Sequence, residues 1–188
     1  VLVVGRKLAR YDYTCFERDQ INCVQMVTRH LLDKGYREMA FIGGSSNVYM
    51  TGQRVNAFLN TLNAAGIASD RAVIIETNFY PEHGYEAALR LIKSERPLPQ
   101  AILAINDRVA MGAMRALKDN GLSVPDDVAI ASCEYFPGSE YFIPRITTVN
   151  HKNDEIGQQV IRQMMTLLQD MLPEAHTITP VLVAGESA

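Results

Sequence analysis

The sequence predicts an α/β protein in which a parallel sheet is flanked by helices. Short apolar runs rich in Val, Ile and Ala alternate with longer segments whose apolar residues recur every three or four positions. The short runs are apolar throughout, as expected of strands that are buried on both faces. The segments between them are long enough to return the chain to the same edge of a sheet, which favours parallel pairing.

Six apolar segments are predicted to be strands. The first begins at residue 1 without an initiator Met, so we expect the chain to be truncated at its N terminus. Most of the others are bounded by Gly, Pro, Asn or Asp, which interrupt regular structure. The predicted strands cover residues 1–4, 39–42, 72–75, 101–105, 128–131 and 178–184.

Five helices are predicted between these strands from their end signals and apolar stripes. Asp19 can cap the first helix, Gly35 ends it, and Gly66 ends the second. Pro81 suits the first turn of the third helix, and Asn106 can cap the fourth. The stripes comprise Val24, Val27 and Leu31; Val55, Phe58, Leu59 and Leu62; Tyr85, Ala88, Leu89 and Ile92; Val109, Ala113, Ala116 and Leu117; and Ile156, Val160, Met164, Leu167 and Met171.

Composition limits the class of protein. With 188 residues, of which 47% are hydrophobic, the chain can bury a core. The net charge of −3 and the scattered Lys and Arg give no footprint for DNA, so this stretch alone should not bind it. No apolar run is long enough for a membrane span. The three cysteines, Cys15, Cys23 and Cys133, lack CxxC spacing and favour a reducing, cytoplasmic compartment.

The sequence lacks the usual enzyme motifs. It contains no GxGxxG after a strand and no GxxxxGK[ST], GxSxG or HExxH. The short turn at residues 43–46 is only a weak signal for a phosphate site, and the four histidines fall in unrelated segments. We therefore predict a protein that is not an enzyme, with no catalytic residue, no metal and no cofactor.

Six blocks of sequence carry a family resemblance. They are HLLDKGYREMAFIGG at 30–44, QRVNAF at 53–58, GYEAA at 84–88, AINDRVAMGA at 104–113, GLSVPDDV at 121–128 and PRITTV at 144–149. In this order, and over almost the whole chain, the blocks resemble the effector-binding domain of LacI/GalR-type transcriptional regulators. The resemblance implies a two-lobed periplasmic-binding-protein-like fold whose first lobe is incomplete here, and a DNA-binding helix-turn-helix domain that this chain lacks.

The resemblance also implies how the chain divides. Residues 1–36 and 150–172 would form part of the DNA-proximal lobe. Residues 37–146 and 173–188 would form the distal lobe. Crossings near 36, 147–150 and 173–177 would let the lobes rotate around a bound effector.

Three residues at strand ends are predicted to bind that effector, because ligands collect at the carboxyl ends of parallel strands. Phe79 matches an aromatic residue that stacks on the ligand in many members, although an ordinary buried aromatic is the alternative. The Asn106 amide could bind a ligand hydroxyl or could serve only as a helix cap. Glu134 falls where the family generally has Asp.

Three further residues are weaker matches to the binding cleft. His151 corresponds to a crossing-strand position that reaches the cleft in some members, and Asn22 to a polar contact from the first lobe. Residues 48–53 hold no Arg where many members of the family have one, so an anionic effector would lack its usual partner and Tyr49 could stack instead. We expect Arg54 itself to pack at its helix start. A neutral sugar or a nucleoside is therefore the predicted effector.

A homodimer is the other partner that the resemblance implies. Met111, Met114, Phe142 and Ile143 match positions where family members meet their twin, but these residues could equally belong to the lobe core. The predicted function is a ligand-responsive transcriptional regulator, most simply a repressor. A periplasmic sugar-binding protein of a transport system is the alternative, and a metabolic enzyme is a more distant one.

Overall fold

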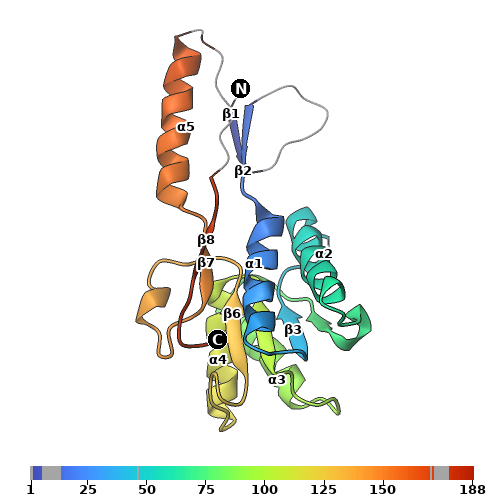
Figure 1. The fold of residues 1–188 in the computed structure, drawn as a ribbon. Coiled ribbons are helices and arrows are strands. Elements are labelled where there is room, and N and C mark those ends of the chain that lie inside the picture. Colours follow the sequence, from blue (N-terminus) through green and yellow to red (C-terminus); the bar gives the residue numbers. More distant parts are fainter. Residues whose placement is uncertain (1, 6–13, 46, 170, 172–177) are drawn as a thin grey trace. The chain divides into compact units, whose positions relative to one another are not determined.

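The computed structural model describes residues 2–5, 14–45, 47–169, 171 and 178–188 (Figure 1). It confirms the predicted α/β class with a parallel sheet. The chain divides into two compact units, one of Val1–Asp19 with Asn150–Val181 and one of Gln20–Val149 with Leu182–Ala188. Within the described ranges, none of the helices combines the length and the apolar run that a membrane crossing requires.

The larger unit is built on a four-stranded parallel sheet. Its strands are β3 (Met39–Ile42), β4 (Val73–Ile75), β5 (Ala101–Ala104) and β6 (Ala129–Ser132), in the order β4-β3-β5-β6. Every residue of β3, β5 and β6 is buried, and all of them except Ser132 are apolar, as expected of strands covered on both faces. After β3 the chain moves to β4 on one side and then crosses to β5 on the other, so a switch point lies between the carboxyl ends of β3 and β5.

Helices cover both faces of this sheet. The helices α1 (Gln20–Asp33) and α2 (Tyr49–Ala64) contact each other on one face, and α3 (Pro81–Ile92) and α4 (Asp107–Asp119) contact each other on the other face (Figure 1). Two short 3₁₀ turns, Ser69–Arg71 and Ser139–Tyr141, lie in the connections. Residues 185–188 join the unit through hydrogen bonds such as the one between the Ile130 N–H and the Ser187 carbonyl, 2.8 Å.

Two glycines allow α3 and α4 to approach each other closely. A Cβ atom at Gly84 would overlap the Val109 backbone, and a Cβ atom at Gly112 would overlap the Pro81 carbonyl. Both residues lie inside helices, where Gly is otherwise unfavourable. The close contact fixes the start of α3 against α4, and therefore positions the loop that ends at Tyr80 relative to Asn106.

The smaller unit contains a pair of parallel strands and one helix. The strands are β1 (Leu2–Gly5) and β2 (Thr14–Glu17), and the helix is α5 (Asn153–Leu168). The helix carries the last predicted apolar stripe except Met171, which lies beyond its end. Two further strands, β7 (Thr148–Asn150) and β8 (Val181–Val183), pair where the two units meet in the sequence. Neither β2 nor β7 is predicted as a strand from the sequence, because each is only three or four residues long and includes polar residues.

The boundaries of the units differ from those expected for the lobes. The first boundary falls after Asp19 and not near residue 36, because Cys23, Val24 and Val27 of α1 are buried in the core of the larger unit. Another boundary falls between residues 149 and 150. The predicted crossing at 173–177 lies outside the described residues. The assignment of the two units to DNA-proximal and distal lobes stays a prediction.

Candidate functional site

A buried arginine lies at the centre of a polar cluster in the larger unit. Arg54 occupies the buried face of α2 and is only 5% exposed. Its Nε donates a hydrogen bond to Gln20 Oε1 at 2.7 Å, and its Nη1 donates to the Ile105 carbonyl at 2.8 Å. Its Nη2 forms an ion pair with Glu134 Oε2 at 2.9 Å. The guanidinium therefore links α1, the end of β5 and the loop after β6.

The same cluster includes the backbone of the α4 start. The Asp107 N–H donates to the Glu134 carbonyl at 3.0 Å, which ties the loop after β6 to the first turn of α4. The fully buried Asp107 carboxylate accepts from the Ser132 hydroxyl and, at 3.0 Å, from the Phe136 N–H. Asp107 thus fixes the loop that carries Glu134, which is the structural role that its buried position favours.

Asn106 caps α4 and also reaches the loop after β4. Its Oδ1 accepts from the Val109 N–H at 2.9 Å, while its Nδ2 donates to the Phe79 carbonyl at 3.3 Å. The amide oxygen is therefore engaged in the cap, and Nδ2 is the atom with a second hydrogen to offer. The Phe79 side chain is 37% exposed, so it is not an ordinary buried aromatic.

The three strand-end residues are thus brought together by direct contacts or by a shared neighbour. Asn106 contacts Phe79, and its neighbour Asp107 contacts Glu134. Their elements, the loops after β4, β5 and β6, all leave the same edge of the sheet. Whether Phe79, Asn106 and Glu134 bind a ligand stays a prediction.

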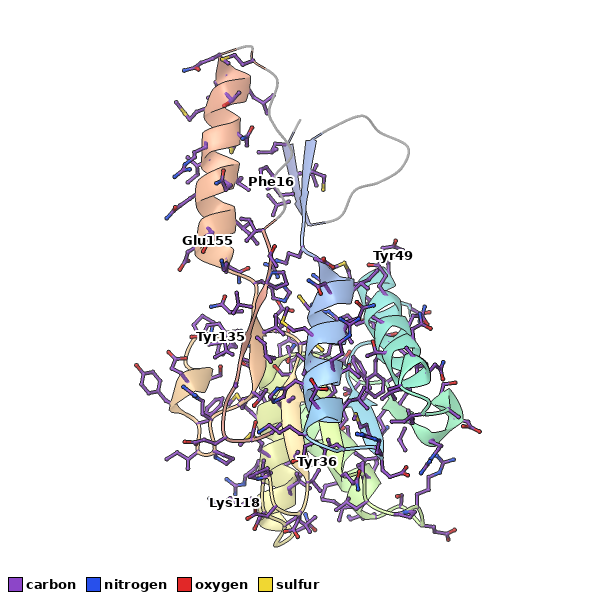
Figure 2. The ribbon with its side chains drawn as sticks, viewed as in Figure 1. Phe16, Tyr36, Tyr49, Lys118, Tyr135 and Glu155 are labelled. Atoms are coloured by element: carbon purple, nitrogen blue, oxygen red, sulfur yellow. The ribbon has the colours of Figure 1, made fainter. Side chains whose placement is uncertain are left out.

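The other three predicted binding residues have more varied positions. Tyr49 is the first residue of α2, is half exposed, and accepts a hydrogen bond from Gln53 Nε2 at 3.0 Å. Figure 2 shows Tyr49 and Lys118 at opposite ends of the larger unit. Asn22 lies in the first turn of α1, within the larger unit. His151 follows β7 in the smaller unit.

Two residues of the cluster were missed by sequence reasoning. Arg54 was expected only to pack at the start of its helix, yet it forms the ion pair with Glu134. A sequence signal for this was available, since Arg54 shares the apolar stripe of α2 with Phe58, and an arginine on such a stripe needs a buried partner. Gln20 lies near the start of α1 and gave no comparable signal.

Among the residues that the structure describes, two buried polar atoms beside these contacts find no hydrogen-bond partner. They are Gln20 Nε2, on the side chain that accepts from Arg54, and Thr51 Oγ1, which lies one helical turn before Arg54. The Thr51 hydroxyl lies against Gly44, where a Cβ atom would overlap it, so the lack of a Cβ makes room for this hydroxyl. Buried polar groups are normally paired, so these atoms mark a place where a polar ligand or water would gain hydrogen bonds.

The chemistry of the cluster suits the binding of a polar molecule. Burial raises the pKa of the nearby Cys133 thiol to about 12, so this cysteine stays protonated and a poor nucleophile at neutral pH. Across the ranges that the structure describes, no group of three or more His, Cys, Asp or Glu side chains is arranged to hold a metal ion. Donors and acceptors held at a switch point are what recognition of a polar small molecule needs.

A separate groove of about 590 Å³ is lined in part by side chains of α4. All four residues predicted at a dimer surface line it: Met111, Met114, Phe142 and Ile143. The first three also contact the hydrophobic core, whereas Ile143 is 94% exposed. Three of the four residues therefore pack against the core, as the alternative reading expects, and the fourth is exposed at the surface.

A parallel α/β unit with a polar cluster at its switch point is the architecture of a ligand-binding domain. The chain belongs to the family described as the periplasmic binding protein-like domain, whose model matches residues 28–188. It is 31% identical over 144 residues to the HTH-type transcriptional repressor PurR of Glaesserella parasuis, an alignment that covers 77% of this chain and 42% of that repressor. The chain thus spans less than half the length of that relative.

Solved structures agree with this assignment. A sugar-binding transcriptional regulator of the LacI family from Escherichia coli, complexed with phosphate, matches all of this chain and 67% of its own, with a TM-score of 0.90 and 25% identity. A LacI family transcriptional regulator from Enterococcus faecium with bound ribose covers 99% of this chain and 69% of its own, with a TM-score of 0.88 and 22% identity. The predicted resemblance to LacI/GalR-type regulators is confirmed.

Proposed function

We propose that this chain is the effector-binding domain of a transcriptional repressor. A small polar molecule would bind at the carboxyl edge of the larger unit's sheet, and its occupancy would change the affinity of the whole protein for operator DNA. The observation that carries this proposal is the Arg54–Glu134 ion pair, held at the switch point beside Asn106 and Phe79. The matched relatives, whose names describe transcriptional regulators and not enzymes, support the DNA-linked role.

The proposed effector is a neutral sugar or a nucleoside. The Glu134 carboxylate and the Asn106 Nδ2 offer an acceptor and a donor for hydroxyl groups, and the exposed Phe79 ring offers a stacking face. The Enterococcus faecium relative binds ribose, which makes ribose a first candidate. The DNA contacts would come from a helix-turn-helix outside this chain, and the protein would act in the cytoplasm.

Calorimetric titration of the intact protein with sugars and nucleosides tests the proposed function. One ligand should bind, and it should change operator affinity in a fluorescence anisotropy assay with labelled DNA. A periplasmic sugar-binding protein would bind a sugar but would show no ligand-dependent DNA binding. If the protein binds neither ligand nor DNA, the proposal is wrong.

Asn106→Asp tests the role of the amide nitrogen in ligand binding. Aspartate keeps an oxygen that can accept from the Val109 N–H, so the helix cap survives, but it removes the Nδ2 donor. Loss of one hydrogen bond to a buried ligand should weaken affinity by about 10- to 100-fold. Asn120→Asp makes the same change at the other end of α4 and should leave affinity unaltered. Equal affinities for the two variants would contradict the proposed role.

We further propose that the groove beside α4 receives a second copy of this chain. Its lining combines apolar side chains, among them Met111, Met114 and Phe142, with the basic side chains of Arg115 and Lys118. Exposed Ile143 would insert into the partner's groove, and a twofold contact of this kind uses the same patch on both copies. The dimer would align two DNA-binding heads with a palindromic operator.

Ile143→Asp should break this dimer. Burial of one isoleucine contributes about 1.5–3 kcal/mol, and twofold symmetry loses it twice, so the dimer dissociation constant should rise by at least about 100-fold. Sedimentation equilibrium of the intact protein measures this constant. Ile143→Leu keeps the apolar volume and should remain dimeric. A dimer that survives Ile143→Asp with unchanged affinity would place the interface elsewhere.

A further inference from the structure

Arg54 is held in place by two neutral acceptors and neutralised by one charged acceptor. Gln20 Oε1 and the Ile105 carbonyl fix the Nε and Nη1 ends of the guanidinium, at 2.7 and 2.8 Å. Neither of these contacts depends on Glu134, which approaches the remaining Nη2 at 2.9 Å. Removal of the Glu134 charge would therefore leave a buried, oriented cation in the same position.

The two members of the ion pair are unequally accessible. The Arg54 side chain is 6% exposed, whereas the Glu134 side chain is 30% exposed. The carboxylate thus occupies the outer side of the guanidinium, where an incoming anion would otherwise bind. A second carboxylate, that of Asp107, lies in the adjacent turn, which is tied to the Glu134 backbone. Together these groups make the edge unfavourable for negative charge.

We propose that Glu134 determines the charge of the effector, because it occupies the anion-binding side of Arg54 and so restricts the site to neutral ligands. This inference rests on the proposed function for the identity of the site. Its physical basis is that a buried guanidinium requires a counter-charge, which the protein itself supplies here. A neutral replacement of Glu134 should therefore convert the site into one that binds carboxylates or phosphates.

The test compares the intact wild-type protein with Glu134→Gln, which keeps the shape of the side chain. Inorganic phosphate, ribose 5-phosphate and glucuronate serve as anionic probes, with ribose and glucose as their neutral counterparts, all measured by calorimetry. Wild-type protein should bind the anionic probes at least about tenfold more weakly than Glu134→Gln does, because charge-assisted pairs to an arginine are strong. Glu134→Ser, a second neutral replacement, should show the same gain if Glu134→Gln fails to fold.

Two controls assign the effect to the proposed contact. Glu140→Gln removes the same charge from an exposed glutamate that bonds Tyr135 and the Gly138 N–H, and it should gain no phosphate affinity. Adding Arg54→Gln to Glu134→Gln should abolish the gain.

The inference is overturned if wild-type protein binds phosphate as tightly as Glu134→Gln does, or if the neutral variants gain nothing. Failure of wild-type protein to bind any neutral probe counts against the proposed function instead. The phosphate comparison between wild type and variant still decides the role of Glu134 in that case.

Discussion

Replacing Arg54 with Met is expected to lower the free energy of unfolding by about 3 kcal/mol and to abolish effector binding. The variant leaves Gln20 Oε1 and the Ile105 carbonyl without their donor, and it leaves the Glu134 carboxylate without its counter-charge. Unpaired buried groups keep their full desolvation cost after a partner is lost. Urea denaturation measures the effect as a lower midpoint with an unchanged m-value.

Arg115→Met is the matched control for this substitution. Arg115 pairs with Asp119 one turn later on α4, but its side chain is 70% exposed. Exposed pairs of this kind contribute about 0.3–0.5 kcal/mol, so this variant should unfold almost like the wild type. Equal losses of stability in the two variants would show that Arg54 is not the buried anchor described here.

Gly112→Ala is expected to destabilise the protein by about 1–3 kcal/mol, although the same change inside a helix is ordinarily stabilising. The added Cβ would overlap the Pro81 carbonyl, so α3 and α4 would have to move apart. This movement would also shift Phe79 relative to Asn106, whose Nδ2 bonds the Phe79 carbonyl. Ligand affinity should therefore fall together with the thermal midpoint.

Gly52→Ala provides the opposite expectation in the same unit. Gly52 lies in α2 and a Cβ atom there would meet nothing within 4 Å. This variant should gain about 0.4–1 kcal/mol, because alanine restricts the unfolded chain. If Gly112→Ala is as stable as Gly52→Ala, the close approach of α3 and α4 does not hold.

Most of the fold could be predicted from the sequence because local pattern and burial agree there. Strand β3 has the predicted bounds, Met39–Ile42. Helix α3 begins at Pro81, the residue predicted for its first turn. The predicted cap at Asn106 is confirmed by its bond from the Val109 N–H. In these elements the spacing of the apolar residues and the residues at the element ends predict the same secondary structure.

The boundary between the units could not be read in the same way. The resemblance implies a boundary near residue 36, whereas the contacts of α1 with distant segments group this helix with the larger unit. The site was predictable only in part for the same reason. Phe79, Asn106 and Glu134 could be predicted because each follows a strand. The roles of Arg54 and Gln20 depend on a hydrogen bond between residues 34 positions apart in the sequence, which no local pattern indicates.

A crystal structure of the intact protein with the sugar or nucleoside selected by calorimetry tests the central claim most directly. The account predicts ligand hydroxyl groups within hydrogen-bond distance of Glu134 and of the Asn106 Nδ2, with a ring face against Phe79. A ligand bound elsewhere, with the Arg54–Glu134 ion pair solvated and untouched, would contradict the account.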